Sequence, residues 1–144
     1  TLAAAAAAAP DLLYVCPTNE PGDVPPGVLP AVVGGAGPDA LDFSDMLRAC
    51  DVVVGKMGYG LVAECIASGV ALLWPRRTGF REDEVVERDG PAVMRMRELP
   101  LADFHAGRWA EHARAAAALP QPPMVMRADG AEVCADWIAE NVRR

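Results

Sequence analysis

The stretch that decides the fold runs from Asp51 to Glu64 and reads DVVVGKMGYGLVAE. It opens with three consecutive valines, a β-branched run that is typical of a buried strand. A glycine-rich turn follows, and beyond it apolar residues recur at helical spacing until Gly69, where we expect the helix to end. The segment therefore predicts a strand, a turn and a helix, which is the repeating unit of parallel α/β sheets.

The same alternation continues in both directions along the chain. Apolar strands that alternate with short helices predict an α/β fold, a Rossmann-like parallel sheet with helices on both faces. The connection over 19–37 is rich in proline and glycine, so we expect it to be mostly loop. The remaining expected strands cover 12–15, 31–33, 70–74 and 92–94, and the remaining expected helices cover 1–9, 42–49, 82–88, 105–118 and 129–143.

Length and composition limit the possible functions. The 144 residues correspond to about one domain, and 52% hydrophobic residues exclude a disordered chain. Thirteen basic and 20 acidic residues give a formal charge of −7, which argues against nucleic acid as a partner. The sequence has neither an apolar run of about 18 residues nor a signal peptide, so we expect a cytoplasmic protein. Four widely spaced cysteines fit reduced, mostly buried thiols.

The chemistry is expected in two loops that follow strands. Ligands of open parallel sheets bind beyond the carboxyl ends of the strands, and Gly58 and Gly60 fall there, at the start of a helix that could hold an anion. Glu64, one turn further, could accept hydrogen bonds from ribose hydroxyls, or it could be a solvated helix residue. The next loop, over 75–83, brings arginines suited to a diphosphate and carboxylates suited to a sugar. The alternative for this loop is a solvated cluster in which the charges neutralise each other.

These two segments, DVVVGKMGYGLVAE and WPRRTGFRE over 74–82, carry a resemblance to a known family. They resemble the donor-binding, C-terminal domain of GT-B glycosyltransferases. Within that class the chain is similar to the group of the peptidoglycan N-acetylglucosaminyltransferase and to the glycosyltransferase-like region of plant L-arabinokinase, whose pattern is GKxGYGTxSE followed by RRxxFxEE. The resemblance covers about residues 40–140.

The resemblance implies the donor-binding portion of a hexosyltransferase, which transfers a sugar from a nucleotide sugar, expected to be a UDP-sugar, to an unknown acceptor. It implies neither a metal nor a cofactor, and it assigns no catalytic residue, because the general base of such enzymes lies in the other domain. The turn would bind the diphosphate, Glu64 the ribose, Glu82 and Asp83 the sugar, and backbone over 41–43 the base. The candidate binding residues are Lys56, Gly58, Tyr59, Gly60, Glu64, Arg76, Arg77, Phe80, Arg81, Glu82 and Asp83.

The resemblance also carries expectations about completeness. Residues 1–144 would form a single nucleotide-sugar-binding domain, a fragment of a two-domain protein that lacks its own first strand. The acceptor domain would be supplied in the same polypeptide or by a partner subunit, and any peripheral membrane contact would come through that half. Leu61 stands where relatives have Thr or Ser, which removes a hydroxyl from the turn. A non-catalytic sugar-nucleotide-binding or interaction module and one subunit of a split transferase therefore remain as alternatives.

Overall fold

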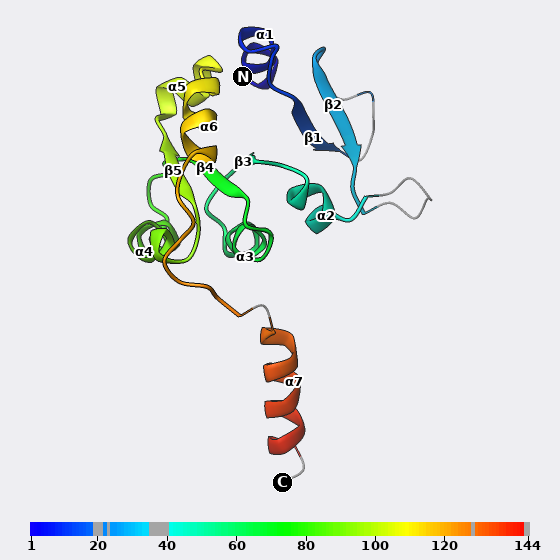
Figure 1. Ribbon diagram of the computed structural model, residues 1–144, viewed down its shortest axis with the longest axis vertical. Helices are drawn as coiled ribbons and strands as arrows, with labels where there is room; N and C mark the ends of the chain where they lie inside the picture. The colour runs from blue at the N-terminus through cyan, green and yellow to red at the C-terminus, as the bar shows by residue number, and fades with distance from the viewer. Residues whose placement is uncertain (19–21, 23, 35–40, 128, 143–144) are drawn as a thin grey trace.

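The structure is a computed structural model that describes residues 1–18, 22, 24–34, 41–127 and 129–142. Its strands are all paired in parallel, as the sequence predicts, and they form two groups (Figure 1). In the first, β1 (Tyr14–Thr18) pairs with β2 (Val28–Val32). In the second, β3 (Val52–Val54), β4 (Ala71–Pro75) and β5 (Met96–Leu99) pair in the order β3-β4-β5.

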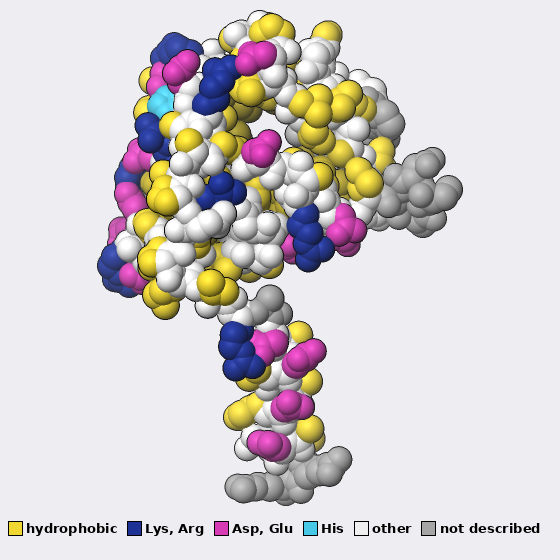
Figure 2. Space-filling model, viewed as in Figure 1, with side chains coloured by type: hydrophobic (Ala, Val, Ile, Leu, Met, Phe, Trp, Pro, Cys, Tyr) yellow, Lys and Arg dark blue, Asp and Glu magenta, His cyan; other side chains and the backbone are white. Residues whose placement is uncertain are grey.

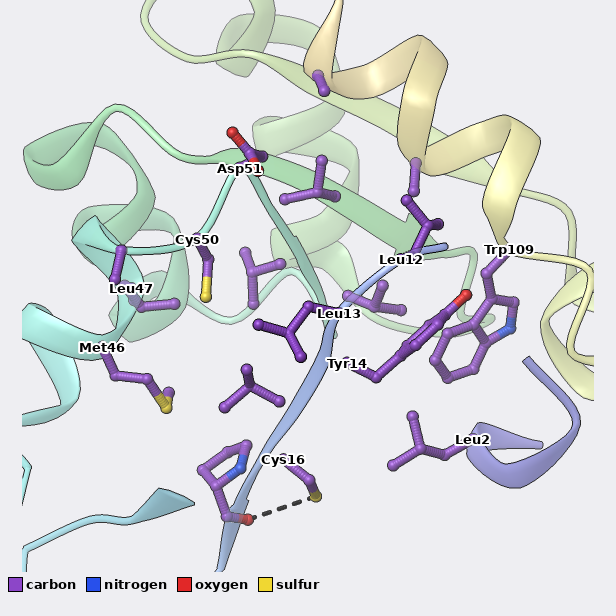
Figure 3. Close-up of a pocket in the computed structure, with 18 of the residues that line it drawn as sticks. Leu2, Leu12, Leu13, Tyr14, Cys16, Met46, Leu47, Cys50, Asp51 and Trp109 are labelled. Carbon is purple, nitrogen blue, oxygen red and sulfur yellow. Dashed lines mark hydrogen bonds between the residues drawn. The ribbon is translucent and has the colours of Figure 1, made fainter. Parts of the chain in front are cut away.

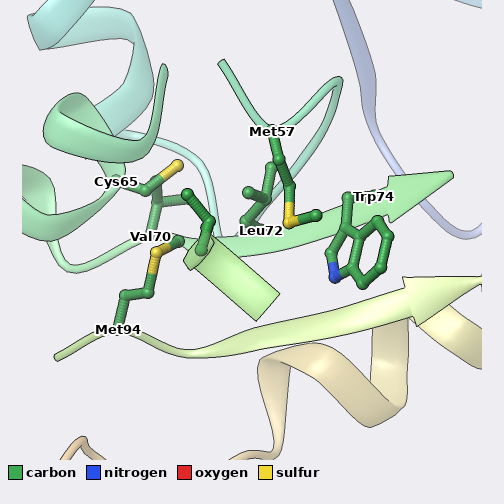
Figure 4. Packing of buried hydrophobic residues seen from close by; sticks show 7 residues of the cluster. Met57, Cys65, Val70, Leu72, Trp74 and Met94 are labelled. Atoms are coloured by element: carbon green, nitrogen blue, oxygen red, sulfur yellow. The ribbon is translucent and has the colours of Figure 1, made fainter. Parts of the chain in front are cut away.

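Helices cover both faces of the second group, so the predicted α/β, Rossmann-like class is confirmed. Successive residues of β4 point to opposite faces. Leu72 and Trp74 belong to one buried cluster and Leu73 to the other. Figure 4 shows the first cluster between the strands and the helices. The helices are α1 (Leu2–Ala8), α2 (Phe43–Arg48), α3 (Tyr59–Ser68), α4 (Arg81–Asp89), α5 (Leu101–Ala106), α6 (Ala110–Ala117) and α7 (Gly130–Asn141), with a 3-10 turn over Gly90–Ala92.

Local sequence explains where the helices next to the β3–α3 turn begin and end. Asp42 caps α2, because its side chain accepts a hydrogen bond of 2.8 Å from the N–H of Ser44. Gly69 ends α3 in the left-handed conformation at φ 73°, which an L-residue adopts only with strain. The structure therefore confirms the helix expected over 42–49 and the expected helix end at Gly69. The glycine-rich turn lies between these two points.

Four predicted elements differ from the structure. Strand β2 begins at Val28, whereas we expected a strand over 31–33 in a connection that is mostly loop. The strand expected over 92–94 is absent, because a 3-10 turn that contains Pro91 runs from Gly90 to Ala92, and the strand forms at Met96–Leu99 instead. The single helix expected over 105–118 is divided into α5 and α6 at Gly107, which has φ 73°. Strand β1 continues through Pro17, where we expected it to stop.

The two closing helices differ in their environment. Trp109 at the start of α6 is buried, and it packs with Leu73 and Leu99. Helix α7 extends away from the rest of the molecule, and its apolar side chains, including Trp137, are exposed (Figures 1 and 2). The helix expected over 129–143 therefore forms, with Val133, Trp137 and Ile138 exposed. Within the described part of the chain, no helix has both the length and the apolar character needed to cross a membrane.

Candidate functional site

The glycine-rich turn connects β3 to α3 and is held on both sides. Before it, the N–H of Gly55 donates to the carbonyl of Leu73 on β4 over 3.1 Å. Within it, Met57 is fully buried in the cluster of Figure 4. Gly58 is the residue that precedes α3, and no side chain caps the first turn of this ten-residue helix. The N–H groups at the start of α3 therefore keep their hydrogen-bonding capacity and their partial positive charge.

Lys56 lies beside this uncapped helix start. A Cβ atom placed on Gly58 would be 3.7 Å from the Cε atom of Lys56, so the end of the lysine side chain lies beside the residue that precedes α3. Lys56 is exposed, and among the described residues no carboxylate lies within ion-pair distance of it. A cation next to a helix N-terminus is electrostatically unfavourable unless an anion is shared between them.

Arg77 joins the loop after β4 to the turn after β3. Its guanidinium forms a bidentate ion pair with Asp83, in which Nε donates over 3.0 Å, and Nη2 also donates to the carbonyl oxygen of Met57 over 3.4 Å. The same group lies 4.0 Å from the ring centroid of Phe80. The side chain of Asp83 is only 7% exposed and that of Arg77 only 20%. The ion pair therefore holds Arg77 against α4, and the hydrogen bond to Met57 links Arg77 to the turn after β3.

Arg76 points to a different ion-pair cluster. It donates to Glu87 on α4 and to Glu98 on β5, with its Nε 3.1 Å from Glu98, and it lies 5.2 Å from the ring centroid of Trp74. The hydrogen bond to Glu87, and after it the one to Glu98, raises the pKa of Arg76 above the ordinary value for arginine. Arg76 thus neutralises neighbouring carboxylates. This is the alternative considered for the loop over 75–83, a cluster in which the charges neutralise each other. Its role at a diphosphate stays a prediction.

The Arg76 cluster predicts a dependence of stability on pH. The hydrogen bond from Arg76 lowers the pKa of Glu87 below its ordinary value of 4.5. A carboxyl group with a depressed pKa in the folded state stabilises the fold above its unfolded pKa, and this contribution is lost as the pH falls through the folded pKa. We expect Glu87→Gln to reduce the slope of unfolding free energy against pH below about pH 4.5. Urea denaturation at several pH values measures this slope, and Glu84→Gln on the same helix is the control. Equal slopes in the two variants would contradict the assignment.

Glu64 lines a hollow of about 320 Å³, together with Ala67 of α3 and residues Met126, Arg127 and Gly130 near the start of α7. Its side chain is half-buried. Glycines Gly58 and Gly60 do not line this hollow. Glu64 therefore lies on the helix that follows the turn, and it shares its hollow with Arg127, a cationic residue that the sequence analysis did not consider. Its contact with a ribose stays a prediction.

Most of the remaining candidates, which we call the rim residues, are exposed. Tyr59 is 59% and Phe80 47% exposed, and Arg81 is exposed with no carboxylate within ion-pair distance in the described chain. Glu82 lies at the margin, 3.5 Å from Arg77. The structure thus brings together the β3–α3 turn, Arg77, Phe80, Glu82 and Asp83, and it directs Arg76 and Glu64 to other surroundings.

Two features escaped the sequence analysis. Asp83 was expected to face a ligand, although its spacing of three from buried Val86 places both on the inner face of α4, a pattern that the sequence contains. An apolar cavity between β1 and β3 was also not foreseen as a binding feature, because its walls come from separate segments of the chain. Burial, and to a smaller extent the charge of Glu64, raises the pKa of the Cys65 thiol to about 12. This cysteine is therefore not a nucleophile. Cys16 and Cys50 are half-buried and Cys134 is exposed, so the expectation of mostly buried thiols is wrong.

Comparison with known proteins adds one distant relative. No family model matches the chain, and no solved structure matches it significantly. The chain is 26% identical over 130 residues to L-arabinokinase from Arabidopsis thaliana. This alignment covers 90% of the chain and 12% of that protein, so the chain spans about an eighth of its relative's length. The similarity supports a distant relationship to a sugar-related enzyme.

Proposed function

We propose that the chain binds the diphosphate of a nucleotide sugar, with UDP as the expected nucleotide, and forms the donor-binding portion of a glycosyltransferase. The observation that carries this proposal is the position of Lys56, an unpaired cation beside the uncapped N-terminus of α3. A diphosphate would accept hydrogen bonds from the first N–H groups of α3 and would neutralise the lysine. The parallel sheet supports this location, because the turn follows the carboxyl end of β3.

The rim residues fit the other parts of such a ligand. Tyr59 and Phe80 offer exposed aromatic surface, and Glu82 offers a carboxylate that could accept hydrogen bonds from sugar hydroxyls. Arg81 adds a second unpaired cation at the start of α4. In a completed transferase the N–H groups and cations would stabilise the negative charge that develops on the departing diphosphate. The similarity to a sugar-related enzyme is consistent with this chemistry.

A second candidate function is a module that binds the sugar nucleotide without catalysing transfer. Leu61 favours it, because its Cδ2 atom packs against Gly55, where an added Cβ would be only 2.6 Å away. This residue therefore supports the turn by packing and contributes no hydroxyl to a phosphate. Acceptor-dependent release of UDP distinguishes the two functions, since only a transferase, alone or with a partner subunit, releases it.

Replacing Lys56 with methionine tests the phosphate site. The change keeps most of the apolar stem and removes the charge, so we expect the affinity for UDP to fall about tenfold, the effect of losing one charge-assisted hydrogen bond. Isothermal titration calorimetry at low ionic strength measures the dissociation constant. Arg97→Met is the matched control, because Arg97 is an exposed cation on β5, which β4 separates from β3. Absence of UDP binding by the unaltered protein at millimolar concentration, or equal weakening in both variants, would overturn the proposal.

A further inference from the structure

Phe80 is an aromatic residue that is exposed and yet held in position. It is 47% exposed. The guanidinium of Arg77 lies 4.0 Å from the ring centroid, at the distance of a cation–π contact, so Arg77 covers one face of the ring. Arg77 is itself held by the ion pair with Asp83, whose side chain is only 7% exposed. The ring therefore has one face fixed against the protein and its other face open to solvent.

The ring of Phe80 lies next to the turn that precedes α3. Nη2 of Arg77 donates to the carbonyl oxygen of Met57 over 3.4 Å, and Met57 comes directly before Gly58, the residue that precedes α3. Two successive contacts therefore separate this turn from the ring. Phe80 is also the residue that precedes α4, so it stands at the carboxyl edge of the sheet, where parallel sheets bind their ligands.

The two sides of the β3–α3 turn differ in their chemistry. Figure 1 shows α2 and α4 on opposite sides of α3. On the side of α2, Val54 and Leu61, which precede and follow the turn, line a cavity of about 560 Å³ between β1 and β3 (Figure 3). Most side chains that line it are apolar, and Asp51 and Arg114 are the charged ones. A ring with several hydroxyl groups would lose its hydrogen bonds to water there without replacing them.

The side of α4 offers the groups that a sugar requires. Glu82, in the first turn of α4, lies 3.5 Å from Arg77, and its side chain is 35% exposed. An ionised carboxylate accepts hydrogen bonds and donates none, so it suits the hydroxyl groups of a sugar. A sugar ring also has faces of C–H groups, which are weakly positive, whereas the face of an aromatic ring is negative. The open face of Phe80 and the carboxylate of Glu82 match these two kinds of group.

We propose that Phe80 is the stacking platform for the sugar ring of the donor, and that the substrate class is a nucleoside diphosphate sugar whose ring presents a face of C–H groups. This inference rests on the proposed function, because the diphosphate at the start of α3 brings the sugar to the ring. Arg77 acts as a positioning residue. It holds the ring from behind and, through Met57, it holds the turn, so one side chain sets the position of the platform relative to the diphosphate.

Tyr59 is the other exposed aromatic residue of the rim, and it lacks such support. It is 59% exposed, and in the described part of the chain no ring or cation–π contact holds its side chain. A ligand that stacks on a mobile side chain must also offset the entropy of ordering it. The ring of Phe80 is already ordered by Arg77, which makes it the better platform.

The affinities for UDP and for UDP-glucose test this inference, because the two ligands differ by the sugar. Isothermal titration calorimetry measures both dissociation constants. Phe80→Leu keeps an apolar side chain and removes the aromatic face, so we expect it to weaken UDP-glucose about fivefold more than it weakens UDP. Phe80→Tyr should preserve the affinity for UDP-glucose. Val85→Ala, which truncates an exposed apolar residue on the same helix, is the matched control.

Proton NMR of the bound ligand distinguishes stacking from a structural effect of the substitution. Protons that lie over an aromatic face shift upfield, so the sugar C–H protons of UDP-glucose should shift upfield with the unaltered protein and with Phe80→Tyr, but not with Phe80→Leu. Absence of this shift, or equal weakening of UDP and UDP-glucose by Phe80→Leu, would contradict the platform while the diphosphate site still stands. Absence of UDP binding by the unaltered protein would contradict the proposed function, and this inference with it.

Discussion

Replacing Gly107 by alanine should destabilise the protein by roughly 3 kcal/mol, the sum of a conformational and a steric cost. Gly107 has φ 73°, a left-handed conformation that is strained for an L-residue. An added Cβ would also lie 2.7 Å from the Cβ of Ala4 and 2.7 Å from the backbone nitrogen of Ala5. The backbone of α1 cannot move away without leaving the cluster that contains Leu73 and Trp109.

Gly69→Ala is the matched control for this prediction. Gly69 has the same φ of 73°, but nothing lies within 4 Å of an added Cβ, so alanine there costs only the conformational part, about 1 kcal/mol. Urea denaturation measures both free energies of unfolding. The larger loss of unfolding free energy in Gly107→Ala than in Gly69→Ala measures the contact between α1 and the α5–α6 turn. Equal losses in the two variants would show that α1 is not packed on this turn.

The sequence predicts the apolar strands of the sheet better than the strand that carries charges. The Val52–Val54 run and β4 are identifiable because both consist of apolar residues, as strands covered by helices on both faces require. Strand β5 reads Met-Arg-Glu-Leu and was missed, because an edge strand needs few apolar residues and tolerates charges. The break at Gly107 was also missed, since one left-handed glycine divides a helix without changing the apolar periodicity. Local pattern therefore identifies the strands whose residues are all apolar, and tertiary contacts decide the remainder.

The candidate site shows a similar division. The sequence correctly places the turn of Gly58 at the carboxyl end of a strand, because this position follows from the order of the elements. It could not show that adjacent Arg76 and Arg77 have different partners, since successive residues at the end of β4 diverge. A cluster of mixed charges has many possible pairings, and the fold selects one of them. Asp83 becomes an internal partner only because α4 turns that face toward Arg77.

Arg77→Met should weaken the binding of UDP by about a hundredfold, the largest effect that we expect on the proposed function. The hydrogen bonds of Arg77 lie within the protein, so their loss weakens binding through the position of the turn, and a hundredfold change in affinity corresponds to about 2.7 kcal/mol. The substitution removes the ion pair with Asp83 and the hydrogen bond to the carbonyl of Met57. The β3–α3 turn then loses its link to the loop after β4, so the N–H groups of the turn are no longer held in place for a diphosphate.

Arg76→Met provides the comparison, because this neighbouring arginine also makes two ion pairs, but to Glu87 and Glu98 on the outer side of the sheet. We expect it to change UDP affinity less than threefold, while circular dichroism shows that both variants remain folded. In the Arg77→Met variant, Asp83→Asn should then restore part of the thermal stability, because it removes the carboxylate left without its partner. Equal losses of affinity for Arg76→Met and Arg77→Met would instead mean that the arginines act through general electrostatic attraction. Only a selective effect of Arg77 is consistent with a binding turn held by a specific internal ion pair.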